Sequence, residues 1–124
     1  MTAREKGIHV LVGSYEYDRV VEPLFGEYPI EQMVIFRSDS PYSKMSELSD
    51  EFIEKVKNNV PKKIETVTVD LYDFGEVFQK TLETFRKYSK KNAPIYLNIS
   101  SAPKLALVAM ISAAYFLREK ADLE

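Results

Sequence analysis

The sequence contains no cysteine and only one histidine, His9. Without cysteine the chain forms no disulfide and offers no thiolate to a metal ion. His9 lies in the middle of a short apolar run, where neither a zinc site nor a histidine-based triad is expected. We therefore expect His9 to pack in the core or at a sheet edge, and we expect no metal centre.

Long hydrophobic segments are also missing. No apolar run follows the charged residues 1–6, so a signal peptide is not expected. The longest apolar stretch runs from Leu105 to Leu117, contains Ser112, and is shorter than the roughly 20 residues that cross a bilayer. The net charge of −2 provides no basic surplus for a dedicated duplex-DNA binder. These features predict a soluble cytoplasmic domain that has no membrane partner.

Neither of the common glycine-rich nucleotide motifs is present. The first apolar run leads into Gly13-Ser14-Tyr15-Glu16-Tyr17, which is neither GxGxxG nor a Walker loop, so no dinucleotide or triphosphate cofactor is expected. Gly13 serves either a sharp turn or direct ligand contact, and the two tyrosines either stack on a base or cover the core. A phosphorylation site at Asp70 is not expected, because no acidic pair follows the first run to hold Mg²⁺.

Hydrophobic periodicity predicts strands that alternate with helices. The expected strands are Ile8–Val12, Gln32–Phe36, Ile64–Val69 and Pro94–Asn98. The expected helices run from Asp18 to about Gly26, Ser46 to Val60, Asp73 to Lys91 and Lys104 to Glu119. The inner face of the second helix is expected to be Leu48, Phe52 and Val56, with Val60 as a further candidate. The inner face of the third is expected to be Phe74, Val77, Phe78, Leu82 and Phe85.

Four strand–helix units predict an α/β fold, a three-layer Rossmann-like parallel sheet with helices on both faces. Residues 1–124 are expected to form a single domain. If the strand order is 3-2-1-4, the fourth strand is left as an apolar edge, which native proteins usually cover. We expect either that the chain is the front part of a longer protein or that a partner covers this edge.

The most informative segment is Asn98-Ile99-Ser100-Ser101-Ala102-Pro103-Lys104, at the junction of the fourth strand and the fourth helix. The backbone N–H groups that begin a helix are unpaired, and the helix dipole favours negative charge there. A phosphate suits this position, and Lys104 would add a positive charge. The same serine and asparagine residues are also ordinary helix caps, so a purely structural junction is the alternative.

The helix after this junction is apolar on every side. A helix of this kind is normally buried all round, yet a chain of this size offers only one sheet to cover it. The small residues Ala106, Ala109, Ala113 and Ala114 would allow a close neighbour. A second copy of the chain is the simplest candidate, and missing C-terminal structure is the other.

The first strand that leads into Gly13-Ser14, and the fourth that ends in Asn-x-Ser-Ser-x-x-Lys, resemble the CARF (CRISPR-associated Rossmann fold) domains. Such domains commonly carry a glycine-containing pair where this chain has Ala102-Pro103, although Pro103 suits a first helical turn. The chain is most similar to archaeal CARF-like N-terminal domains that precede a winged helix–turn–helix in a group of transcriptional regulators.

This resemblance implies a homodimer formed through the fourth helix, with one symmetric pocket that binds a cyclic oligoadenylate, often the tetramer. The phosphates would lie over Ser100, Ser101 and Lys104, and the adenines would reach toward Ser14, Tyr15 and the loop around Ser38. The complete set of expected ligand contacts is Gly13, Ser14, Tyr15, Ser38, Asn98, Ser100, Ser101 and Lys104. DNA would be bound only by a domain outside this chain.

Three functions remain open at this stage. The first is a ligand-sensing module that regulates a transcription or effector domain. A few members of the resembled family cleave the ring by attack of a 2′-hydroxyl on the adjacent phosphorus, in which Lys104 and Ser101 would align and stabilise charge. The third possibility is a Rossmann-like assembly domain without a ligand.

Overall fold

The computed structural model describes residues 6–13, 30–39, 45–59, 63–90, 94–98 and 102–120. Within them, four parallel strands form one sheet in the order β3-β2-β1-β4. The strands are β1 (Gly7–Val12), β2 (Ile30–Ser38), β3 (Lys63–Val69) and β4 (Ile95–Asn98). All four predicted strands are confirmed, and so is the order 3-2-1-4.

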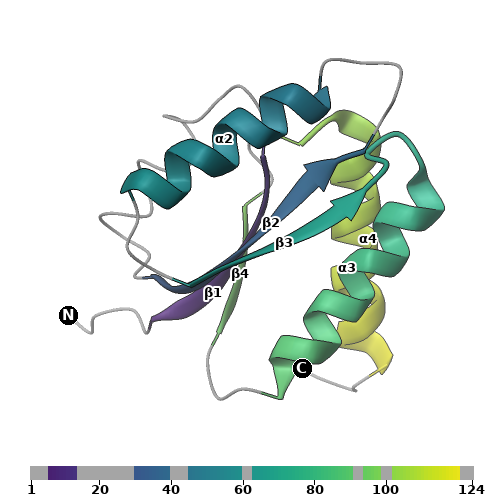
Figure 1. The fold of residues 1–124 in the computed structure, drawn as a ribbon. Helices are drawn as coiled ribbons and strands as arrows, with labels where there is room; N and C mark the ends of the chain where they lie inside the picture. The colour runs from purple at the N-terminus through teal and green to yellow at the C-terminus, as the bar shows by residue number, and fades with distance from the viewer. Residues whose placement is uncertain are drawn as a thin grey trace.

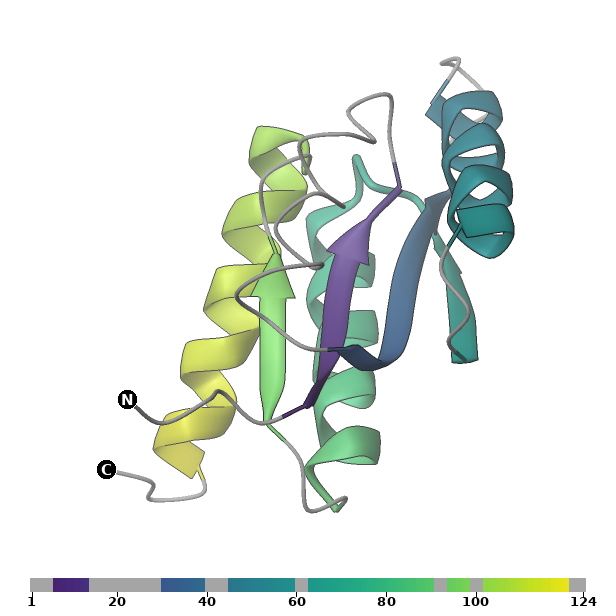
Figure 2. The ribbon, with the colours of Figure 1, turned by 90° about the vertical axis from the view of Figure 1, so that its left-hand side faces the viewer.

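Helices cover both faces of this sheet. Figure 1 shows α2 (Met45–Asn59) on one face, and α3 (Phe74–Ser89) and α4 (Lys104–Lys120) on the other. Figure 2, turned by 90°, shows the strands spread side by side, with α3 behind them. The predicted three-layer α/β architecture is confirmed. The helix expected from Asp18 to about Gly26 lies outside the described residues.

The core forms because β1 and β2 are buried on both faces, as expected for central parallel strands. On the face of α3 and α4, the buried cluster contains Ile8, Val10, Val12, Val34, Phe36, Val69, Leu71, Val77, Phe85, Tyr88, Ala106, Ala109 and Met110. On the face of α2, it contains Leu11, Ile30, Met33, Ile35, Phe52, Ile53 and Val56. Because successive side chains of β1 and β2 point to opposite faces of the sheet, these strands contribute to two separate hydrophobic cores.

Two residues of β1, His9 and Gly7, fix its pairing with β4 through their contacts with Tyr96. His9 is buried, and its ring lies 4.9 Å from the ring of its register partner Tyr96, which confirms the packing role predicted for it. Gly7 lies against the same tyrosine, because a Cβ there would be 2.5 Å from the Tyr96 ring and 2.7 Å from the carbonyl oxygen of Pro94. Only glycine allows this approach.

Asp73 caps the N-terminus of α3, close to the predicted start of this helix. The Asp73 carboxylate accepts the N–H of Glu76 at 3.1 Å, and Asp70 accepts the N–H of Tyr72 at 3.0 Å in the turn before it. Asp70 is therefore engaged in a local turn. The prediction that Phe74 is buried is wrong: it is 41% exposed, because it is the first residue of α3 and stacks on Phe78 beside the helix.

A chain of polar contacts joins β2, α3 and β3 near the start of the two strands. The Gln32 amide donates to the Tyr88 hydroxyl at 2.8 Å, and that hydroxyl donates to Glu65 at 2.8 Å. Lys87 forms an ion pair with the same carboxylate. Burial alone raises the pKa of Glu65, but the hydrogen bonds from Lys87 and Tyr88 outweigh it and hold the pKa below its ordinary value.

Candidate functional site

The direction in which strands are added to the sheet reverses between β1 and β4. The chain moves from β1 to β2 to β3 in one direction, and then returns to place β4 on the other side of β1. In open parallel sheets, ligands bind at such a reversal, beyond the carboxyl ends of the strands. Gly13 directly follows β1 and Asn98 ends β4, so two of the predicted site residues flank this position.

Gly13 is held tightly at the end of β1. Its N–H donates to the Phe36 carbonyl at 3.0 Å, which extends the pairing with β2. A Cβ at this position would lie 3.1 Å from Ile35 and 3.3 Å from the Phe52 ring of α2. Close packing by Ile35 of β2 and Phe52 of α2 is therefore one physical reason for glycine here. The sharp turn considered from the sequence involves residues after Gly13, which lie outside the described residues.

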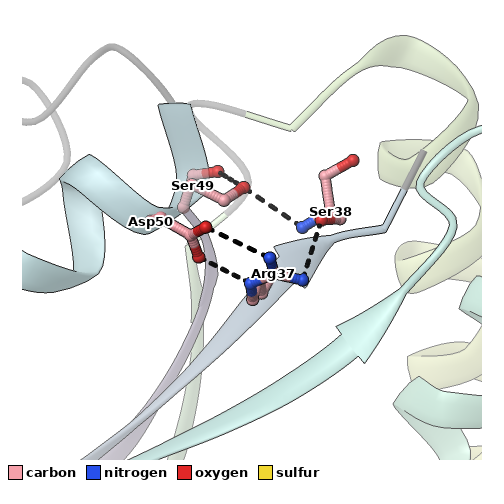
Figure 3. Close-up of polar contacts among 5 residues, drawn as sticks. Arg37, Ser38, Ser49 and Asp50 are labelled. Carbon is pink, nitrogen blue, oxygen red and sulfur yellow. Dashed lines mark hydrogen bonds and ion pairs between the residues drawn. The ribbon is translucent and has the colours of Figure 1, made fainter. Parts of the chain in front are cut away.

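Ser38 ends β2 and is buried, with 0% of its surface exposed. Its N–H donates to the hydroxyl of Ser49 at 3.1 Å, and that hydroxyl donates to the Gly13 carbonyl at 2.7 Å. Figure 3 shows Ser49 of α2 beside Ser38, with the hydrogen bond drawn. Ser38 therefore helps to hold the end of β2 in place, although its side chain is buried beneath the protein surface.

An ion pair lies directly beside this contact. Arg37 donates to both oxygens of Asp50, with its Nε at 2.6 Å and its Nη2 at 3.1 Å (Figure 3). The hydrogen bond from Arg37 lowers the pKa of Asp50 below its ordinary value, and the same bond raises the pKa of Arg37. Both side chains are partly exposed, so the pair orients α2 on β2 and contributes modestly to stability.

Sequence reasoning missed Ser49, Arg37 and Asp50. The helix expected to start at Ser46 begins at Met45, and the serine that contacts the strands is Ser49. The only sign of Ser49 in the sequence is that it directly follows Leu48, which belongs to the predicted inner face of this helix. The pattern gives no indication of which strand ends it reaches.

The junction of β4 and α4 carries the positive charge. Lys104 is the exposed first residue of α4, and the N–H of Leu107 donates to the Pro103 carbonyl at 2.8 Å to close the first turn. The first turn of α4 contains no acidic residue. The positive end of the helix dipole and the Lys104 side chain therefore act at the same place, without a carboxylate on that turn to oppose them.

The register of β4 with β1 connects this junction to Gly13. Asn98 is the register partner of Leu11, two residues before Gly13. The structure therefore brings Gly13, Asn98 and the start of α4 to the same end of the sheet, where the strands have their carboxyl ends. Ser38 lies at the end of the adjacent strand β2. The other four predicted contacts, Ser14, Tyr15, Ser100 and Ser101, lie outside the described residues.

The exposed surface of α4 is largely apolar. Ala106, Ala109, Met110 and Ala113 are buried against the sheet, whereas Leu105, Val108 and Tyr115 are 40%, 52% and 61% exposed. Residues 105, 108 and 115 follow helical spacing and therefore share one side of α4. We call Leu105, Val108 and Tyr115 the outer face of α4.

A hollow lies along β3 and α3, at the side of the sheet far from β4. Its volume is about 340 Å³, and its lining includes two lysines and two glutamates. Lys87 pairs with Glu65, and Lys80 lies 3.8 Å from Glu83, so these charges largely compensate one another. This hollow is far less suited to an anion than the start of α4.

Nowhere in the described ranges do three or more histidine or acidic side chains gather closely enough to hold a metal ion. Of the helices in the described part of the chain, none has the length and apolarity needed to cross a bilayer.

Solved structures show what the fold resembles. The chain is similar to Can2 from Sulfobacillus thermosulfidooxidans in complex with cyclic tetra-adenylate, with a TM-score of 0.66 and 16% identity over 89% of this chain. It spans 29% of the Can2 chain. NADPH-bound carbonyl reductase from chicken fatty liver has a TM-score of 0.49 and 12% identity, with 89% of this chain and 50% of that chain covered. The likeness to Can2 shows an α/β fold of the Rossmann-like kind.

Sequence comparisons define the family. No curated protein matches the chain. The family model described as "HFX_2341_N:-like, N-terminal" matches residues 7–123, which include every described strand and helix. The chain therefore belongs to the HFX_2341_N:-like, N-terminal family.

Proposed function

We propose that this chain is a ligand-sensing domain that binds a cyclic oligoadenylate, or a similar anionic nucleotide, at the carboxyl ends of β1 and β4. The observation that carries the proposal is the exposed Lys104 at the start of α4, beside the reversal of strand order. The likeness of the fold to Can2, which was solved with cyclic tetra-adenylate, supports this ligand class.

The electrostatics of the junction favour a phosphate. Three effects act in the same direction: the unpaired N–H groups of the helix start, the helix dipole and the ammonium group of Lys104. A charge-assisted contact of this kind contributes about 1.5–3 kcal/mol. A ring of phosphates presents several such groups, so a small number of cations is sufficient in a chain whose net charge is −2.

The proposed contacts follow the strand ends. Lys104, Ser100 and Ser101 would hold the phosphates, and Asn98 would border them at the end of β4. Gly13, Ser14 and Tyr15 would receive an adenine at the end of β1. Because Ser38 is buried, its contribution would be to place the end of β2 beneath the ligand.

A homodimer would complete the pocket. The outer face of α4 leaves Leu105, Val108 and Tyr115 exposed along the helix that begins at the site, and burial of such a face in a second copy would remove apolar area from water. The symmetric dimer would bring two copies of Lys104 toward one cyclic ligand. A two-fold interface of this kind places the same surface on both subunits.

The sensor would act on another module of the protein. The family is described as an N-terminal domain, which fits a regulatory unit placed before a transcription or effector domain in the cytoplasm. The regulators considered from the sequence are archaeal and carry a winged helix–turn–helix. In that arrangement, DNA would be bound by the downstream module alone.

Isothermal titration calorimetry against cyclic tri-, tetra- and hexa-adenylate tests the proposal. We expect a binding heat for at least one ring, with cyclic tetra-adenylate as the first candidate. No heat for any of the three would contradict the proposal and leave the assembly function. Chromatography of the same mixtures after incubation would reveal linear products if the protein is a ring nuclease.

A further inference from the structure

Ser49 is a buried polar residue with two partners that are both far from it in sequence. It is 0% exposed, and its hydroxyl accepts the Ser38 N–H and donates to the Gly13 carbonyl. These two bonds use the hydroxyl as donor and as acceptor at once. A buried polar group so paired is retained at little cost, whereas an unpaired one is strongly unfavourable.

The bonding of Ser49 differs from that of the buried hydroxyls of α3. Thr81 and Thr84 donate to the carbonyls of Val77 and Lys80, four residues earlier in their own helix. That local pattern is the usual one for a hydroxyl inside a helix. Ser49 instead joins three elements, because it bonds α2 to the ends of both β1 and β2 (Figure 3).

The neighbouring ion pair reinforces the same register. Consecutive residues of α2, Ser49 and Asp50, contact consecutive residues of β2, Ser38 and Arg37. The inner contact is buried and the outer one is partly exposed. A shift of α2 along the sheet would therefore break both contacts together.

We infer that Ser49 is a positioning residue of the candidate site, which orders the ends of β1 and β2 and thereby sets the affinity for the ligand. The inference rests on the proposed function. It assigns to Ser49 no contact with the ligand. Loss of its hydroxyl would leave the Gly13 carbonyl and the Ser38 N–H without this partner in a buried place. Ligand binding would then have to order the two strand ends, which makes the net binding free energy less favourable.

The test compares Ser49→Ala with Val56→Ala. Val56 is also buried on α2, but it packs in the core away from the strand ends, so its truncation destabilises the fold without removing the bridge. For both variants and the unmodified protein, we would measure the melting temperature, the dissociation constant for cyclic tetra-adenylate, and the hydrogen exchange rate of the Ser38 amide. The exchange rate needs no ligand.

We expect Ser49→Ala to bind cyclic tetra-adenylate about 10-fold more weakly and to exchange the Ser38 amide at least about 10-fold faster, a loss typical of one buried hydrogen bond. Val56→Ala should lower the melting temperature but leave the affinity unchanged. Equal affinity in all three proteins, or equal weakening in both variants, would overturn the positioning role while leaving the proposed function intact.

The two hypotheses fail in different ways. If the unmodified protein does not bind the ring, the proposed function fails, and the ligand role of Ser49 fails with it. Faster Ser38 exchange in Ser49→Ala would then show that the bridge serves the fold alone. Unchanged exchange would show that the hydrogen bond does not order the end of β2, which overturns the inference whatever the affinity.

Discussion

Asn98, the last residue of β4, lies beside Leu11 of β1 in the parallel register. This pairing brings the start of α4 to the end of the sheet where β1 reaches Gly13. The same two strands are fitted together at their other end by Gly7, whose backbone contacts the Tyr96 ring. The geometry of the candidate site therefore depends on contacts along the whole length of β1 and β4.

The first prediction concerns this β1–β4 contact. Gly7→Ala should destabilise the protein by about 1–3 kcal/mol, because its Cβ would lie 2.5 Å from the Tyr96 ring and 2.7 Å from a backbone oxygen. The matched control is Gly75→Ala in α3, where the nearest atom would be 3.6 Å away. That change should be neutral or stabilise by about 0.5 kcal/mol, since alanine favours the helix.

Urea unfolding of the two glycine variants provides the measurement. The midpoint should fall for Gly7→Ala and stay or rise for Gly75→Ala. If both variants unfolded at the midpoint of the unmodified protein, the close packing of β1 against Tyr96 would be refuted.

The second prediction concerns the outer face of α4. Tyr115→Glu should weaken a homodimer, because a charge would replace an apolar side chain that is 61% exposed in the single chain. Tyr72→Glu is the matched control, since Tyr72 is 50% exposed but lies before α3, outside this face. Neither change should unfold the chain.

Sedimentation velocity over a range of protein concentrations distinguishes these cases. We expect the unmodified protein and Tyr72→Glu to form dimers. Tyr115→Glu should remain monomeric at concentrations about 10-fold above those at which the unmodified protein dimerises. A monomeric unmodified protein, with or without cyclic tetra-adenylate, would contradict the dimer proposal.

The third prediction concerns acid stability. The pKa of Glu65 is lowered in the folded state: burial opposes the shift, and the hydrogen bonds from Lys87 and Tyr88 exceed it. A carboxyl group with a depressed folded pKa stabilises the protein above its unfolded pKa, and this contribution is lost as the pH falls through the folded value. The free energy of unfolding should therefore decline as the solution is acidified below the ordinary glutamate pKa of 4.5.

Glu65→Gln isolates this effect, because it removes the titrating group and keeps the shape of the side chain. The variant should show a shallower decline of unfolding free energy with falling pH than the unmodified protein. Lys87→Met should act in the same direction, since it removes one of the two donors to the carboxylate. Identical pH slopes for all three proteins would show that Glu65 is not coupled to folding.

Much of the fold follows from the sequence, for identifiable reasons. Apolar runs such as Ile8–Val12 give strands because both faces are buried, and the order of elements indicates the parallel sheet. Phe74 was wrongly expected in the core, because helical spacing alone does not tell that the first residue of α3 extends past the sheet. Periodicity fails at element ends for this reason.

The candidate site was less accessible to sequence reasoning. Lys104 was identified because a helix start and a positive charge coincide in adjacent residues, which is a local signal. Ser49 was not, since its two partners lie 36 and 11 residues away and depend on how α2 packs on the sheet. Burial of Ser38 was missed for the same reason: tertiary packing decides it.

The central claim is that the start of α4 binds the phosphates of a cyclic oligoadenylate. The most direct measurement is the dissociation constant of cyclic tetra-adenylate for the unmodified protein, Lys104→Ala and Lys57→Ala. Lys57→Ala carries the same change of charge in the last turn of α2, away from the carboxyl ends of the strands. We predict binding by the unmodified protein and by Lys57→Ala, and an affinity at least about 10-fold weaker for Lys104→Ala. Equal affinity of the two lysine variants, or no binding by the unmodified protein, would contradict the claim.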